Sequence, residues 1–412
     1  MTVFIYFIFY IVCALNIISG IRKKENGILF TAALCLVFIL MTFNYNGADI
    51  GVYLAAYDKV VNSAQPFQAV YMEWGYTLLS VVCGRMGLDF FAFRAIITII
   101  ILSLFVNTVK YYKAQRNLVI GAYMLYLFVF DTIQIRNCIV QFIILFATRY
   151  LFQKSGWSTL KFLICIVIAG SIHTIAYVYL SLILIKIFKK PSFYKYLFIF
   201  VMALFATFIV LQPLLPQIEA IISKLLSRGT GYLSGTITIG WFIVFLLYII
   251  GLIALRTCKS KVKDERAKAI INTIIKVNII LGLFLPLTFF NNNFNRVFRN
   301  NIILTLIGLT LIYKNSASAN HRQASLCAFI AINAGWIYSD MFARYDINVI
   351  LKPIFENNLL VNGLASNLLS YALVICLSLA ATWTLKSIVY PKKGMNGIGL
   401  YSANGMSRGG SV

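Results

Sequence analysis

The chain has 412 residues, of which 61% are hydrophobic and 12% are charged, and its mean hydropathy is +0.86. Soluble globular domains carry about 25% charged residues, so this composition excludes a soluble protein. The formal net charge of +24 does not require nucleic acid as a partner, because the basic residues of membrane proteins gather in their cytoplasmic loops.

Apolar runs with the length of a transmembrane helix recur along the chain. A helix needs about 20 apolar residues to cross the hydrocarbon core, and these runs lack the alternation of barrel strands. We therefore predict an all-α, polytopic integral membrane protein in which residues 1–393 form one transmembrane domain. The Gly- and Ser-rich residues 394–412 are expected to be disordered. About thirteen spans are predicted, near residues 2–20, 27–43, 92–109, 118–134, 138–152, 160–173, 174–188, 196–212, 238–255, 269–290, 301–313, 323–339 and 366–388.

Residues 75–89 are apolar but short, and they contain Arg85. If this segment spanned the membrane, the basic loop at 110–116 would share a side with the acidic segment 44–74. We therefore predict a re-entrant or interfacial helix here, with the N-terminus outside and the C-terminus in the cytoplasm. This topology places 25 of the 36 Lys and Arg residues, but only 3 of the 12 acidic residues, on the cytoplasmic side. Such an asymmetry is what the positive-inside rule describes.

The predicted outer side carries several polar clusters, and ionisable groups near the membrane are normally paired or functional. The first is the turn Asn46-Gly47-Ala48-Asp49, followed by Tyr53 and Tyr57 on one helical face. Asp49 is either a helix N-cap or a catalytic group. The second cluster is Glu73-Trp74-Gly75-Tyr76. Here Glu73 is either a helix cap or a general base.

A third cluster, Gln134-Ile135-Arg136-Asn137, joins two spans through almost no loop. Arg136 therefore lies close to the membrane surface, and a functional role is favoured. Arg94 similarly begins a span at its outer end. His173 lies at the outer tip of a helical hairpin, where it either caps a helix or serves in proton transfer.

The segment Asn291–Asn301 is rich in amides and contains Arg296 and Arg299, three residues apart on one side of a predicted helix. Two guanidinium groups in this arrangement suit phosphate binding, and a solvated loop is the alternative. Asp340 and Arg344 are spaced for an i,i+4 ion pair, for which we expect a structural role.

These clusters, in this order, resemble the EpsG-like branch of the Wzy-type polysaccharide polymerases. The resemblance runs from about residue 44 to 300, and the amide-rich segment at 291–301 departs from it. The matching elements are Asn46-Gly47-Ala48-Asp49 with Tyr53, Glu73-Trp74-Gly75-Tyr76, Arg94, Gln134-Ile135-Arg136-Asn137, His173 and Asn295-Arg296.

The resemblance implies a membrane glycosyltransferase, similar to the GT-C class, in the bacterial cytoplasmic membrane. Such enzymes join oligosaccharide repeat units carried on polyprenyl diphosphate at the outer face, and build capsule, exopolysaccharide or O-antigen chains. The implied partners are the lipid-linked oligosaccharide and the bilayer, with a chain-length regulator and a flippase as further candidates and no nucleic acid. No cofactor is expected, and the eight scattered cysteines offer no metal-ligand spacing.

The chemistry assigns roles to these residues as a hypothesis. Negative charge grows on the leaving diphosphate, and preorganised cations stabilise it. The candidate diphosphate and substrate ligands are Arg136, Arg296, Arg94, Arg299, Asn137 and Tyr53. The candidate bases for the attacking hydroxyl are Glu73, His173 and Asp49.

Two other functions stay open at this point. One is a lipid-linked monosaccharide transferase with an outer acid such as Asp49 as its base. The other is a transporter or flippase of a lipid-linked saccharide, because an arginine-lined cavity also suits transport.

Overall fold

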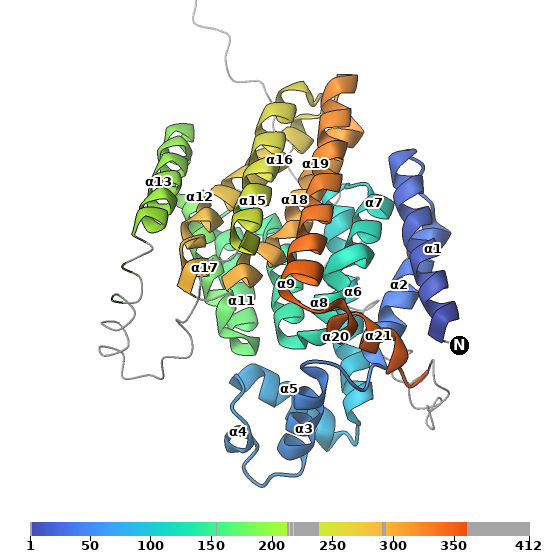
Figure 1. The fold of residues 1–412 in the computed structure, drawn as a ribbon. Helices are drawn as coiled ribbons and strands as arrows, with labels where there is room; N and C mark the ends of the chain where they lie inside the picture. The colour runs from blue at the N-terminus through green and yellow to red at the C-terminus, as the bar shows by residue number, and fades with distance from the viewer. Residues whose placement is uncertain are drawn as a thin grey trace, which may run out of the picture.

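The computed structural model describes residues 2–153, 155–211, 214, 217, 239–290 and 294–360. Within these ranges the chain is helical, with two isolated β-bridges and no strand (Figure 1). The predicted span 366–388, the tail 394–412 and the amides Asn291–Asn293 lie outside the described residues.

Nine helices of the described residues are long and apolar enough to cross a membrane. Seven are the helices α1 (Thr2–Ile21), α6 (Phe90–Tyr112), α13 (Pro191–Val210), α15 (Ile239–Cys258), α16 (Glu265–Leu281), α18 (Asn295–Asn315) and α19 (Ala319–Ile337). The other two are composite: α7 (Arg116–Ala122), a π-helical turn (Tyr123–Leu127) and α8 (Phe128–Ile133), and then α9 (Ile135–Ala147) with α10 (Arg149–Phe152).

Three shorter apolar helices complete the bundle. They are α2 (Gly27–Thr42), α11 (Gly156–Ile172), and a 3-10 segment (Thr174–Ile183) that continues into α12 (Leu184–Ile187). The twelve apolar helices coincide with the first twelve predicted spans, and the thirteenth lies outside the described residues.

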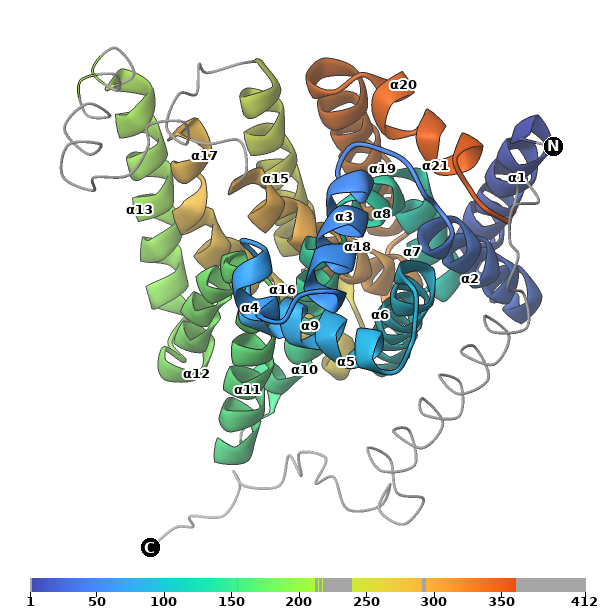
Figure 2. The same cartoon turned by 90° about the horizontal axis from the view of Figure 1, so that it is seen from below.

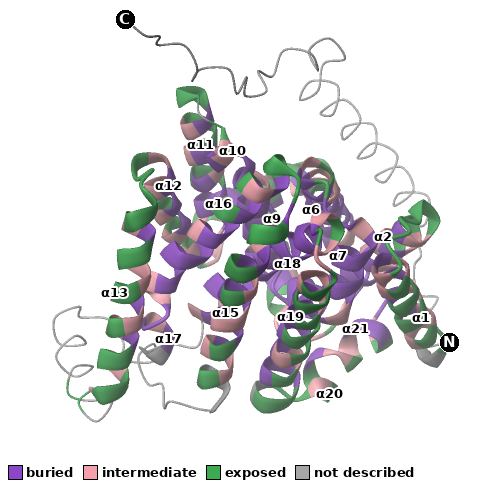
Figure 3. Cartoon of the chain, turned by 90° about the horizontal axis from the view of Figure 1, so that it is seen from above, coloured by how far each residue is buried: buried purple, intermediate pink, exposed green. Residues whose placement is uncertain are grey.

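The most buried helices lie at the centre of the bundle, and the least buried lie at its edges. Of the residues in Arg116–Ile133, 89% are buried inside the protein, against 17% in Pro191–Val210. Figure 3 shows buried residues concentrated on α9, α16 and α18, and exposed residues along α1 and α13. Since α1 and α13 are apolar on their exposed faces, lipid is the solvent that suits them.

The loops that are rich in Lys and Arg lie together at one end of the bundle, where ion pairs and backbone hydrogen bonds join them. Glu25, between α1 and α2, lies 3.7 Å from Arg116 Nε and 3.1 Å from Lys314 Nζ. The Ala317 amide donates to the Lys261 carbonyl at 3.0 Å. We call this the basic end; it comprises the connections at residues 22–26, 113–115, 259–264 and 316–318.

The opposite end carries the helices that do not cross the bundle: α3 (Ile50–Val61), α4 (Pro66–Ala69), α5 (Trp74–Arg85), α20 (Ile347–Ile350) and α21 (Lys352–Glu356) (Figures 1 and 2). Asn44, which follows α2, connects that helix to α21, because its Nδ2 donates a hydrogen bond to the Pro353 carbonyl at 2.8 Å. With 12 residues, α5 is about 18 Å long, too short to cross about 30 Å of hydrocarbon. This length agrees with the predicted re-entrant or interfacial helix.

Candidate active site

Glu73 lies at the centre of a three-residue group at the end opposite the basic end. Its Oε2 forms an ion pair with Arg136 Nη1, and its Oε1 lies 3.2 Å from His173 Nδ1. Oε1 also accepts a hydrogen bond from the Thr174 amide at 3.2 Å. We call Glu73, Arg136 and His173 the Glu73 cluster; their side chains are between 16% and 20% exposed, so a ligand can reach them.

Local backbone features place each member of the cluster. The chain breaks at Gln134 (φ −103°, ψ 62°) and starts α9 at Ile135, so Arg136 lies in the first turn of that helix. His173 ends α11 in an extended conformation (φ −156°), and its amide donates to the Ala169 carbonyl.

Gly75 brings α5 close to α11. A Cβ at this position would lie 2.3 Å from Ser171 Oγ and 2.7 Å from the Ser171 carbonyl oxygen, which is closer than van der Waals contact permits. Ser171 precedes His173 by two residues, and Gly75 follows Glu73 by two. The absence of a side chain at Gly75 therefore lets the carboxylate and the imidazole meet.

The electrostatics of the cluster favour an ionised Glu73. Burial acts to raise the pKa of the Glu73 carboxyl, but the contact with His173 and the positive charge of Arg136 outweigh it and lower the pKa to about 2. The side chain of Glu73 forms no N-cap hydrogen bond with α5. The structure thus favours a role in the charged cluster over the predicted alternative of a helix cap.

Tyr53 and Tyr57 share the buried face of α3, as their spacing predicts. The Tyr53 ring centroid lies 5.7 Å from the Arg136 guanidinium carbon, a distance at which a cation is attracted to an aromatic face. The Tyr57 hydroxyl donates to the Leu88 carbonyl at 2.7 Å and so fixes the connection before α6. Tyr53 therefore belongs to the surroundings of the cluster, whereas Tyr57 is structural.

Arg296 and Asp49 lie near this group and are free to contact a ligand. Arg296 is partly buried at the start of α18, and its electrostatic neighbours include Arg299, Tyr53 and Asp49. Asp49 occupies the N-cap position of α3, but its side chain makes no capping hydrogen bond. Within the described residues, neither side chain has an ion pair closer than 4 Å.

Arg94 has a different environment from the one expected for a diphosphate ligand. It is 1% exposed, and it donates to two backbone carbonyls, those of Asn44 at 2.6 Å and Thr132 at 3.3 Å. These bonds connect α6 to the end of α2 and the end of α8. The geometry favours a bracing role for Arg94, which the sequence could not distinguish from a binding role.

Arg299 also lies inside the bundle, in a buried polar network. It is 3% exposed, hydrogen-bonds Gln134 Oε1, and lies 3.7 Å from Asp340 Oδ2. Asp340 in turn accepts a hydrogen bond from the Tyr126 hydroxyl. The expected ion pair of Asp340 with Arg344 involves a side chain that lies outside the described part, and the backbone forms a π-helical turn at Tyr338–Arg344.

Asn137 forms a reciprocal amide pair with Asn300, with Nδ2-to-Oδ1 distances of 2.9 and 3.0 Å. The pair joins α9 to α18, the helices that carry Arg136 and Arg296. Asn137 thus fixes the relative position of two candidate ligands. The partner residue Asn300 lies in the amide-rich segment that the sequence singled out, but its pairing could not be predicted.

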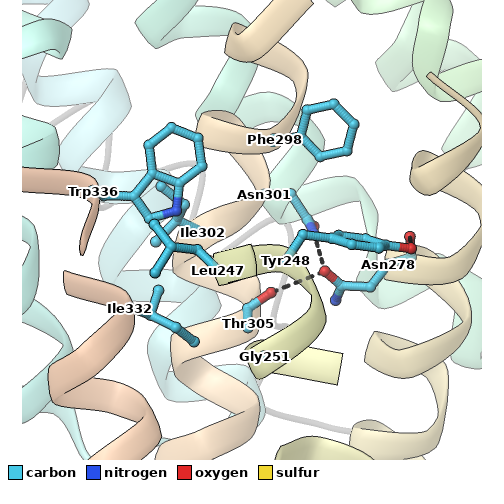
Figure 4. Close-up of a pocket in the computed structure, with 10 residues that line it drawn as sticks. All are labelled: Leu247, Tyr248, Gly251, Asn278, Phe298, Asn301, Ile302, Thr305, Ile332 and Trp336. Carbon is cyan, nitrogen blue, oxygen red and sulfur yellow. Dashed lines mark hydrogen bonds between the residues drawn. The ribbon is translucent and has the colours of Figure 1, made fainter. Parts of the chain in front are cut away.

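A second polar group lies within the bundle, beyond the cluster. Asn278 Oδ1 accepts from Asn301 Nδ2 at 2.9 Å and from Thr305 Oγ1 at 3.2 Å, beside a cavity of about 30 Å³ (Figure 4). Trp336 and Tyr248 also line this cavity. It has room for about one or two water molecules, so it is too small to hold a sugar.

Tyr76 is the residue of the site to which sequence reasoning assigned no role. It is 1% exposed, and its hydroxyl has no hydrogen-bond partner in the described part of the chain. Both Arg94 and Arg136 act on it electrostatically. Its signal was its place in the motif Glu73-Trp74-Gly75-Tyr76, where a tyrosine follows the candidate base by three residues.

Within the residues that the structure describes, no three His, Cys, Asp or Glu side chains lie close enough together to share a metal ion. The side chains that the site brings together are those of one charged cluster with an arginine and a carboxylate beside it.

Comparison with known proteins agrees with the motif order. The model of the EpsG family matches residues 27–350, a range that includes the Glu73 cluster, Arg296 and Asp49. No curated protein and no solved structure matches the chain. Because the family match covers well over half of the sequence, this chain belongs to the EpsG family.

Proposed function

We propose that this protein is a polysaccharide polymerase that joins oligosaccharide repeat units carried on polyprenyl diphosphate. The observation that carries the proposal is the convergence of Glu73, Arg136 and His173 from three separate motifs, with Arg296 and Asp49 beside them. Membership of the EpsG family suggests the same class of activity.

The proposed location of the reaction is the outer face of the bacterial cytoplasmic membrane. The cluster lies at the end opposite the basic end, and basic connections face the cytoplasm in membrane proteins. The same rule favours an outer position for the N-terminus of α1. A substrate at the outer face is a lipid-linked saccharide that has already crossed the membrane, so a flippase and a chain-length regulator are candidate partners.

The proposed reaction forms one glycosidic bond and breaks one bond to phosphate. An acceptor hydroxyl attacks the anomeric carbon of the growing chain, the bond to the lipid diphosphate breaks, and the hydroxyl proton passes to a base. The diphosphate leaves with the bonding electrons, so its negative charge grows in the transition state. Arg296, which has no ion pair within the described residues, is the candidate to stabilise that charge.

Arg136 is the second candidate cation. Nη1 is paired with Glu73, and Nε is buried without a hydrogen-bond partner in the described part of the chain, while the side chain as a whole is 20% exposed. Arginine presents five N–H donors in a planar fork, so Arg136 can hold Glu73 and still donate to a phosphate oxygen. The Tyr53 ring beside it restricts the orientation of the guanidinium.

His173 is the favoured base of the three candidates. Because Nδ1 faces the Glu73 carboxylate, the tautomer with a proton on Nδ1 leaves Nε2 to accept the hydroxyl proton. Glu73 is itself a weak base, since its pKa is lowered to about 2, but its charge stabilises the imidazolium that forms. Asp49 is the alternative base, because its carboxylate has no capping partner.

Reconstitution in liposomes with lipid-diphosphate repeat units tests the proposal. The expected product is a ladder on a gel with steps of one repeat unit, lost in Arg136→Ala and Arg296→Ala. Arg85→Ala removes an exposed arginine from α5 and should keep the ladder, which controls for loss of charge alone. If the protein transferred single sugars, its function would be that of a monosaccharide transferase and not of a polymerase. If the substrate crossed the membrane without forming new glycosidic bonds, the function would be that of a transporter.

A further inference from the structure

An open crevice lies between α3 and the start of α6. Its volume is about 380 Å³, which falls in the range of small-molecule sites, about 300–1,000 Å³. Four residues of α3 line it at the spacing of a single helical face: Leu54, Tyr57, Asp58 and Val61. The facing wall is the connection from α5 to α6 and the first turn of α6, including Gly87, Asp89, Phe90 and Phe91.

The lining of the crevice selects a class of ligand. Asp58 and Asp89 are exposed carboxylates, and no Lys or Arg is among the lining residues. The two negative charges repel phosphate and are incompatible with a hydrocarbon chain, whose contact would desolvate them. Carboxylates accept hydrogen bonds from hydroxyl groups, and the partly exposed side chains of Leu54 and Phe91 provide apolar surface above the buried Tyr57 ring. A neutral, hydroxyl-rich ligand satisfies both features.

A row of buried aromatic rings packs between the crevice and the Glu73 cluster. The Tyr53 ring, which lies against Arg136, is 6.0 Å from Tyr76; Tyr76 is 5.6 Å from Phe93, and Phe93 is 5.0 Å from Tyr57 in the crevice wall. Tyr57 follows Tyr53 by one helical turn, a rise of about 6 Å. The crevice therefore lies along α3, beyond the turn of this helix that carries Tyr53 and faces the charged cluster.

We propose that this crevice is a saccharide subsite, which holds a neutral sugar of the lipid-linked oligosaccharide while the reacting sugar lies at the Glu73 cluster. The proposal rests on the proposed polymerase function for the identity of the ligand. Asp58 accepts hydrogen bonds from sugar hydroxyls, and Phe91 and Leu54 contact the apolar face of the sugar. Asp89 contributes a second carboxylate, whose Oδ1 also caps α6 by accepting a hydrogen bond from the Ala92 amide at 2.8 Å.

Two variants of α3 test the subsite, with a control on another face of the same helix. Val61→Trp fills the crevice and Asp58→Asn removes its exposed charge, whereas Val52→Trp adds the same bulk at a 63% exposed position that does not line it. The probe is the sugar-only oligosaccharide released by mild acid from lipid-linked repeat units of the source cells. Binding is measured by isothermal titration on protein in nanodiscs, and KM and kcat are measured in the polymerisation assay.

We expect Val61→Trp and Asp58→Asn to weaken oligosaccharide binding and to raise KM about tenfold, the size expected for losing one hydrogen bond to a charged group. The kcat should change little, and Val52→Trp should resemble the wild type. Equal binding by Val61→Trp and wild type, an equal loss in Val52→Trp, or equal affinity for sugar-free polyprenyl phosphate at the crevice would overturn the subsite.

The outcomes also separate this inference from the proposed function. If the wild-type protein makes polymer and both crevice variants keep the wild-type KM, the subsite proposal is wrong and the polymerase proposal stands. A wild-type protein that makes no polymer but binds the oligosaccharide in a Val61-dependent manner supports the subsite and rejects the polymerase.

Discussion

Glu73 Oε1 lies 3.2 Å from His173 Nδ1, although the two residues belong to different helices and are separated by 100 positions in the chain. The same carboxylate holds Arg136 through its other oxygen. Glu73 therefore orients a candidate base and a candidate phosphate ligand at once, and its removal should affect both.

This relationship predicts non-additive effects of substitutions at Glu73 and His173. Glu73→Gln and His173→Asn should each lower kcat by about 10²–10⁴-fold, the range that positioned acid–base groups contribute. The double variant should lose little more than the worse single variant, because the two residues act as one unit. The measurement is a double-mutant cycle on polymer formed per minute. Losses that multiply would show that the residues act independently and would favour Asp49 as the base.

The lowered pKa of Glu73 predicts how the stability of the cluster depends on pH. The folded-state pKa is about 2 and the ordinary value is 4.5, so the stabilisation is complete above about pH 5 and disappears as the pH falls through 4 towards 2. Its upper limit is about 3 kcal/mol, which solvent screening of this partly exposed group reduces. Thermal unfolding of wild type and Glu73→Gln should differ most at pH 7, differ by less than half as much at pH 3, and converge near pH 2. A constant difference across this range would contradict the assignment.

Gly75 predicts a steric requirement that polarity and charge do not reveal. Gly75→Ala places a Cβ 2.3 Å from Ser171 Oγ, so α5 must move away from α11, at a cost of about 1–3 kcal/mol. The displacement should also reduce polymer formation, because it separates Glu73 from His173. Gly51→Ala is the control, since a Cβ at Gly51 meets nothing within 4 Å and Ala favours the helix. Equal unfolding temperatures of the two variants would show that α5 can shift without loss.

The sequence predicts the helices better than it predicts their contacts. Hydropathy locates the apolar helices because lipid exposure is a local property, visible in α1 and α13. The meeting of Glu73 with His173 depends on how α5 packs on α11, and its sequence signal is one glycine. Likewise, the charge of Arg94 is visible in the sequence, but its hydrogen-bond partners are the backbone carbonyls of Asn44 and Thr132. Because every residue has a backbone carbonyl, the residue types cannot predict these partners.

Arg296 and Arg299 show the same limit, and they predict opposite phenotypes. Arg299 is buried against Asp340 and Gln134, so Arg299→Ala leaves a buried carboxylate without this partner and should destabilise the protein by about 3–5 kcal/mol. Arg296→Ala should leave the unfolding temperature nearly unchanged and abolish the polymer ladder. Thermal unfolding and the liposome assay, run on the same preparations, separate the two effects. Normal unfolding with full activity in Arg296→Ala would remove this residue from the site.

Tyr76→Phe offers a test of a buried hydroxyl that has no partner in the described part of the chain. Burying such a group costs about 1–3 kcal/mol, and phenylalanine fills the same space without it. The ring contacts with Tyr53 and Phe93, at 6.0 and 5.6 Å, persist in the variant. If the hydroxyl serves only as part of the fold, the unfolding temperature should therefore rise or stay constant, and polymer formation should be unchanged.

A variant that unfolds normally but loses activity at least tenfold would instead assign the hydroxyl to the substrate, since it lies in the field of Arg94 and Arg136. We expect the first result, because Tyr76 is 1% exposed and a substrate reaches the cluster through the more exposed side chains of Glu73 and His173.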